Sequence, residues 1–120
     1  MAAKSSMFNA YLSVYKYGMA LIDESVRGHR QRLRQRFAAH GFDGFHDYEV
    51  LELLLTYAIP RSDVKPVAKR LLDAFGTLAG VFDAPVVELA QVKGVGEKAA
   101  VFLNIVKQAE LRYLASDLPG

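Results

Sequence analysis

The 120-residue sequence contains no cysteine. This absence excludes disulfide bonds, thiolate metal sites, cysteine nucleophiles and thiol redox chemistry, and it fits a reducing cytoplasm. No apolar run approaches the roughly 20 residues that a membrane-spanning helix requires. Ser13, Lys16 and Gly18 interrupt the apolar residues near the N-terminus, so no secretory signal peptide is predicted. We therefore expect an unprocessed cytoplasmic protein with no membrane partner.

Acidic residues are missing from the most basic stretch of the chain. The length, the hydrophobic content of 52% and the charged content of 23% are typical of one globular domain. The net charge of +2 gives only a weak electrostatic case for a nucleic-acid partner. However, five arginines and no acid lie between Arg27 and Arg36. This run predicts either a phosphate-binding surface or a helix face that pairs with carboxylates of the same domain.

Alternating strand patterns are absent too, and apolar residues recur at three- and four-residue spacings. The fold class is therefore predicted to be all-α, a compact helical domain. Glycines and prolines predict the helix boundaries. The predicted helices cover about residues 8–22, the segment from Gly28 to Gly41, His46–Ala58, the segment from Asp63 as N-cap to Gly76, Thr77–Phe82, Pro85–Val92 and Glu97–Ala115. The predicted core includes Leu54, Leu71, Val95, Ala100 and Leu103.

Three segments are expected along the chain. Residues 1–26 form an N-terminal extension that is partly helical, residues 27–115 form the folded domain, and residues 116–120 form a linker or tail. The interpretation of the extension rests on apolar residues at helical spacing between Phe8 and Ile22.

The most informative pattern is Leu89-x-x-Val92-Lys93-Gly94-Val95-Gly96-x-x-x-Ala100-x-x-Leu103. Two glycines so close together predict backbone conformations that a side chain would obstruct. Such a turn directs N–H groups outward at a helix start, where unsatisfied donors and the helix dipole favour an anion. Lys93 and Lys98 flank this predicted turn. A plain helix–helix turn without a ligand is the alternative.

This pattern resembles the helix-hairpin-helix motif, which binds the DNA backbone independently of base sequence. The resemblance also implies that carbonyls of the Gly94–Gly96 hairpin can hold a monovalent cation. An earlier segment repeats part of the pattern, because Ala68 and Leu71 precede Ala100 and Leu103 at a constant offset. It lacks the glycine pair, so we expect tandem units of which the first is degenerate. Whether the first unit also contacts DNA stays open.

Four blocks of sequence together resemble the N-terminal domain of the bacterial RadC family, which is named for DNA repair. The blocks, in chain order, are Gly28–Arg34, Tyr48–Leu55, Tyr57–Pro66 and Val92–Gly96, and the resemblance covers about Val26 to Leu114. Members of this family usually carry a C-terminal JAMM/MPN metalloprotease-like domain with a His-x-His zinc signature. That signature is absent from this sequence, so the family's zinc chemistry is not carried over.

Other chemistry finds little support in the sequence. The three histidines and the nearby Asp43 and Asp47 match no recognised metal-ligand spacing, so no metal site is predicted. Glu49 and Glu52 are interpreted as ordinary helix charges. No serine lies near a histidine in a nucleophile elbow, and no enzyme is predicted.

The leading hypothesis is a non-enzymatic, sequence-independent DNA-binding module that grips phosphates through the backbone amides of residues 94–98. The alternative is a protein-interaction or regulatory helical module without DNA affinity, which the modest net charge favours. The predicted DNA-binding residues are Lys93, Gly94, Val95, Gly96, Glu97, Lys98, Arg61, Ser62, Lys65, Arg30 and Arg34.

Overall fold

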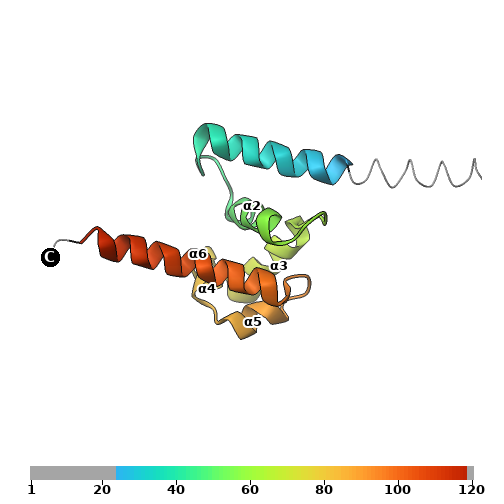
Figure 1. The fold of residues 1–120 in the computed structure, drawn as a ribbon. Coiled ribbons are helices and arrows are strands. Elements are labelled where there is room, and N and C mark those ends of the chain that lie inside the picture. The colour runs from blue at the N-terminus through green and yellow to red at the C-terminus, as the bar shows by residue number, and fades with distance from the viewer. Residues whose placement is uncertain (1–23, 119–120) are drawn as a thin grey trace, which may run out of the picture.

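The computed structural model describes residues 24–118. Helices and short turns make up this part of the chain, and it contains no strand (Figure 1). The predicted all-α class is therefore confirmed. The predicted helix over residues 8–22 and most of the predicted 1–26 extension lie outside the described residues.

The first described helix covers residues 24–40 and crosses above α2, which spans Asp47–Ala58 (Figure 1). This helix is already formed at residue 24, so the predicted start after Gly28 is wrong. The helix also continues across the predicted boundary between the 1–26 extension and the 27–115 domain. Its predicted end is confirmed. Gly41 adopts a φ of 64° and donates its N–H to the Phe37 carbonyl at 2.7 Å.

Helix α3 spans Lys65–Phe75 and follows α2 after a short turn. Its N-cap is Val64 rather than the predicted Asp63, whose Oδ1 instead accepts the N–H of Lys65 at 3.1 Å. Pro66 stands in the first turn, as predicted, where its missing N–H costs little. The helix ends at Gly76, also as predicted, with a φ of 83°.

Two short helices lead to the longest one. Helix α4 spans Leu78–Asp83 and begins at Thr77, whose hydroxyl accepts the N–H of Gly80 at 2.9 Å. Helix α5 spans Val86–Gln91, with Pro85 as its N-cap rather than its first residue. Helix α6 spans Gly96–Ser116, one residue longer at each end than predicted. Its C-terminal end projects beyond the other helices (Figure 1).

The main core joins α2 to α6 and contains four of the five predicted core residues. The fifth, Leu54, is half-buried and packs against the same cluster. Buried positions repeat between α3 and α6 at the offset found in the sequence, as Val67, Ala68 and Leu71 in α3 and as Ala99, Ala100 and Leu103 in α6. Among residues 24–118, no helix is long and apolar enough to cross a membrane.

Candidate nucleic-acid interface

The turn between α5 and α6 depends on its two glycines for different reasons. Gly94 has a φ of 92° and Gly96 a φ of 71°, conformations that other residues rarely adopt. A Cβ on Gly94 would also lie 2.8 Å from Cγ2 of Val67, whereas a Cβ on Gly96 would meet nothing within 4 Å. Arg70 donates to the Lys93 carbonyl at 3.1 Å. The turn is thus held closely against α3, and only Gly94 is required by this close approach.

Backbone amides without acceptors gather at the start of α6. The N–H groups of Gly96, Glu97 and Lys98 precede the first intrahelical acceptors, and the N-cap Val95 offers no side-chain oxygen. Within the described part of the chain, no backbone or side-chain group accepts from these three amides. Val95 differs, because its own N–H donates to the Val92 carbonyl at 3.0 Å. The prediction that the Val95 amide is available to a ligand is therefore wrong.

Charged side chains surround these open amides. Lys93 and Lys98 are exposed on either side of the turn, and Glu97 is exposed between them. The carboxylate of Glu97 occupies the first turn of α6, where it interacts favourably with the helix dipole. The turn therefore combines three open donors with two lysines and one acid, an arrangement that accommodates an anion.

The earlier turn, between α2 and α3, offers no comparable set of amides. The Lys65 N–H is bonded to Asp63, and Pro66 has no N–H. Ser62 is also satisfied locally, because both its N–H and its hydroxyl donate to the Pro60 carbonyl. Arg61 is exposed and adopts a φ of 66°. The side chain of Lys65 extends over the ring of Tyr48, with Nζ 5.5 Å from its centroid.

Arg30 holds the end of α2 and the turn that follows. Its guanidinium donates to the carbonyls of Thr56 at 2.9 Å, Ile59 at 2.6 Å and Ser62 at 2.6 Å. The Thr56 carbonyl needs such a donor because the residue four positions later, Pro60, has no N–H to give it. Arg30 is 8% exposed, and desolvation followed by repulsion from Arg34 lowers its pKa.

Arg34 also contacts the end of α2. It donates to the Thr56 carbonyl at 3.1 Å, and its guanidinium lies 4.4 Å from the ring centroid of Tyr57. The guanidinium groups predicted to contact phosphate at Arg30 and Arg34 are therefore committed to backbone carbonyls. We leave both residues out of the DNA-contacting surface proposed below.

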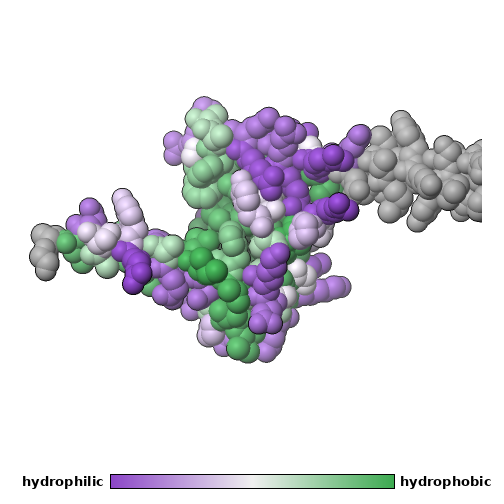
Figure 2. All heavy atoms as spheres, viewed as in Figure 1, coloured by the Kyte–Doolittle hydropathy of each residue, from purple (hydrophilic) through white to green (hydrophobic). Residues whose placement is uncertain are grey.

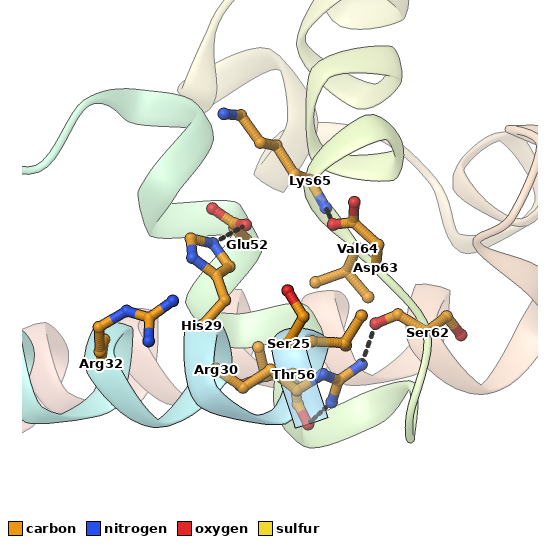
Figure 3. A pocket seen from close by; sticks show the side chains of 11 residues that line it. Ser25, His29, Arg30, Arg32, Glu52, Thr56, Ser62, Asp63, Val64 and Lys65 are labelled. Carbon is orange, nitrogen blue, oxygen red and sulfur yellow. Dashed lines mark hydrogen bonds and ion pairs between the residues drawn. The ribbon is translucent and has the colours of Figure 1, made fainter. Parts of the chain in front are cut away.

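Two acids on α2 contact side chains of the 24–40 helix. The Glu49 carboxylate accepts from Arg36 at 2.6 Å, which raises the pKa of Arg36, while the hydrogen bond from Arg36 and then that from the His46 N–H lower the pKa of Glu49. Glu52 is 1% exposed and lies 2.8 Å from Nε2 of His29 (Figure 3). The interpretation of these acids as ordinary helix charges is wrong. The signal for Glu52 was its position within the otherwise apolar stretch of α2.

Most arginines of this run therefore join the 24–40 helix to α2 and to the turn that follows it. Arg30, Arg34 and Arg36 contact α2 or the turn after it, whereas Arg27 and Arg32 are exposed. Among the histidines, His29 contacts one acid, Glu52, at 2.8 Å. In the described ranges, no three His, Asp or Glu side chains are grouped so that they could hold a metal ion.

Sequence reasoning missed an apolar groove beside the open amides. Tyr57, Val101, Phe102 and Ile105 line it together with Lys98. Tyr57 and Ile105 are 63% and 57% exposed. Figure 2 shows an apolar band across the middle of α6 that continues toward α5. The sequence signal for this groove was the pair Val101 and Ile105. These apolar residues lie four positions apart on one face of α6 and are not among its buried residues.

Comparison with known proteins gives one consistent result. The family model described as UPF0758 N-terminal matches residues 28–101. A UPF0758 protein of Fusobacterium nucleatum is 49% identical over 84 residues, which cover 70% of this chain and 36% of that protein. A UPF0758 protein of Ruegeria pomeroyi is 51% identical over 87 residues, or 72% of this chain and 39% of that protein.

A UPF0758 protein of Rhodobacter capsulatus is 49% identical over 84 residues. The chain thus spans well under half the length of these relatives. No solved structure matches the chain. Because the family model covers more than half of the sequence and follows the helices from residue 28 into α6, the chain belongs to the UPF0758 N-terminal family.

Proposed function

We propose that this domain is a non-enzymatic module that binds DNA without base specificity, through the turn between α5 and α6. The observation that carries the proposal is the group of open amides at Gly96, Glu97 and Lys98. They stand at the start of a 21-residue helix, with two exposed lysines beside them. Open donors and the helix dipole together attract an anion. In DNA, the anions that a helix start contacts are the backbone phosphates.

Two further considerations support a DNA partner. The Leu89–Leu103 segment resembles the helix-hairpin-helix motif, and the wider chain resembles the RadC family, which is named for DNA repair. Phosphate contacts carry no base information, so binding is expected to be equal for unrelated sequences. Because the α2–α3 turn offers no comparable set of open amides, we expect contact with about two phosphates and a log–log salt slope near −2 for duplex DNA.

Titration of fluorescent duplex DNA with the 120-residue chain, over a range of salt concentrations, tests the proposal. Lys98→Ala is expected to weaken binding equally for two unrelated sequences and to reduce the salt slope by about one unit. Arg112→Ala serves as the matched control, because it removes one positive charge about 21 Å farther along α6. Absence of binding at low salt, with helicity preserved, would contradict the proposal. An equal loss in both variants would contradict the assignment of the site.

The apolar groove favours a second candidate, a protein-interaction module. Tyr57, Val101 and Ile105 expose a continuous apolar surface that DNA phosphates do not need. A Val101→Glu variant separates the candidates, because it places a charge in the groove and leaves the amides of the turn in position. Under the DNA-binding proposal, this variant binds DNA at most a few times more weakly than the original chain.

A further inference from the structure

A separate cavity lies where residues 26–30 approach the α2–α3 turn. It has a volume of about 360 Å³ and is lined by Val26, Arg27, Arg30 and Arg61. Three of these four residues are arginines, and no carboxylate of residues 24–118 lines the cavity. The neighbouring cavity in Figure 3 differs, because Glu52 and Asp63 contribute to its wall. Arg30 lines both cavities.

Arg30 brings a buried positive charge to this place, and no acid of the described residues forms an ion pair with it. Its terminal nitrogens donate to carbonyls, but its Nε is buried and has no hydrogen-bond partner. In residues 24–118, none of the ion pairs involves Arg27, Arg30 or Arg61. Asp63 is the acid whose charge acts on Arg30, and its Oδ1 already accepts the Lys65 N–H. Asp23, four residues before Arg27, lies outside the described residues.

We propose that this cavity is a binding site for a phosphate group. Arg27 and Arg61 are exposed and supply guanidinium forks that match phosphate oxygens, while Arg30 contributes its positive charge. A buried positive charge beside two further arginines is unfavourable by itself and becomes favourable when an anion binds. Arg61 is also the one residue other than glycine with positive φ in the described chain, and such conformations recur at ligand sites.

This site shares no described residue with the α5–α6 turn and does not rest on the proposed DNA binding. The shared chemistry is a phosphate with at least two free oxygens. It can come from free phosphate, from the 5′ end of a DNA strand or from the DNA backbone.

Titration of the ¹⁵N-labelled chain with inorganic phosphate, followed by backbone amide NMR at constant ionic strength, tests the proposal. Phosphate is expected to shift the signals of Arg27, Arg61 and their neighbours more than chloride does. Arg61→Gln and Arg27→Gln are each expected to weaken phosphate binding roughly tenfold, since each removes charged hydrogen bonds. Arg112→Gln is the matched control and is expected to leave binding unchanged. Equal effects of phosphate and chloride, or unchanged binding in both cavity variants, would overturn the proposal.

Two short oligonucleotides then identify the source of the phosphate. A 5′-phosphorylated dinucleotide that shifts these signals, when its 5′-hydroxyl form does not, assigns a strand end. Equal shifts with both assign a backbone phosphate, and shifts with inorganic phosphate alone assign the free ion. A Gly96→Val variant separates this site from the proposed function, because it disturbs the α5–α6 turn and is expected to leave the phosphate titration unchanged.

Discussion

The α2–α3 hairpin and the α5–α6 hairpin bury residues at corresponding positions, yet their turns are built differently. In the first, Arg30 donates to three carbonyls around the turn, and Asp63 and Pro66 leave few free amides at the start of α3. In the second, two glycines with positive φ shape the backbone, and the amides of Gly96, Glu97 and Lys98 have no acceptor among the described residues.

This difference shows that the same pattern of buried helical residues can follow two turns with different hydrogen bonding. Side chains satisfy the first turn from within, so it stabilises the fold and holds the 24–40 helix against α2. Glycine conformations shape the second turn, which Arg70 joins to α3 through the Lys93 carbonyl, and the amides at the start of α6 have no acceptor among the described residues. Val95 has helical backbone angles and packs in the core, so position 95 offers these donors no side-chain acceptor.

The largest expected effect concerns the glycines of the second turn. Gly94→Ala is expected to lower the free energy of unfolding by about 3 kcal/mol, because left-handed strain adds to overlap with the branched Val67 side chain. Gly96→Ala meets open space, so we expect about 1 kcal/mol from strain alone. Urea denaturation of both variants measures the difference. Equal losses would mean that the turn is not held against α3 as described.

The next effect concerns the first turn. Arg30→Lys keeps the charge but cannot donate to three carbonyls at once, so we expect a loss of about 2 kcal/mol in unfolding free energy. Arg32→Lys is the matched control, because Arg32 is an exposed arginine on the same helix. Thermal or urea unfolding, followed by circular dichroism, compares the two. A loss no greater than that of the control would show that the carbonyls find other donors.

Much of this fold was predictable from local signals. Helical apolar spacing predicts the all-α class, and the helix ends at Gly41 and Gly76 follow from the tolerance of glycine for positive φ. Boundaries without such a signal were missed. Nothing in the sequence opposes helix before Gly28, so the helix begins earlier. The N-cap of α3 is Val64, whose side chain is buried in the core, rather than the polar Asp63.

The candidate sites were less predictable because they depend on pairs of residues that are distant in sequence. The glycine pair and its lysines identified the second turn from local pattern alone. The arginine run gave no indication that Arg30 and Arg34 would reach carbonyls more than twenty residues away. The cavity formed by Arg27, Arg30 and Arg61 joins two segments in the same way, and only the packing of the 24–40 helix on α2 brings them together.

The smallest expected effect is a pH dependence within the first hairpin. Hydrogen bonds from Arg36 and the His46 N–H lower the pKa of Glu49 in the folded state, so this carboxylate contributes stability above its unfolded pKa. That contribution is lost as the pH falls below about 4 and passes through the folded pKa.

Arg36→Gln removes the larger cause of this shift, so the variant and the original chain are expected to differ slightly at pH 7 and to converge under acid. Urea unfolding between pH 7 and pH 2 measures the convergence. Glu49→Gln is expected to flatten the same part of the curve, and the double variant is expected to add little to either single change, because both act on one contact. A constant difference between Arg36→Gln and the original chain across the pH range would assign the effect of Arg36 to its packing against the ring of Phe45 instead.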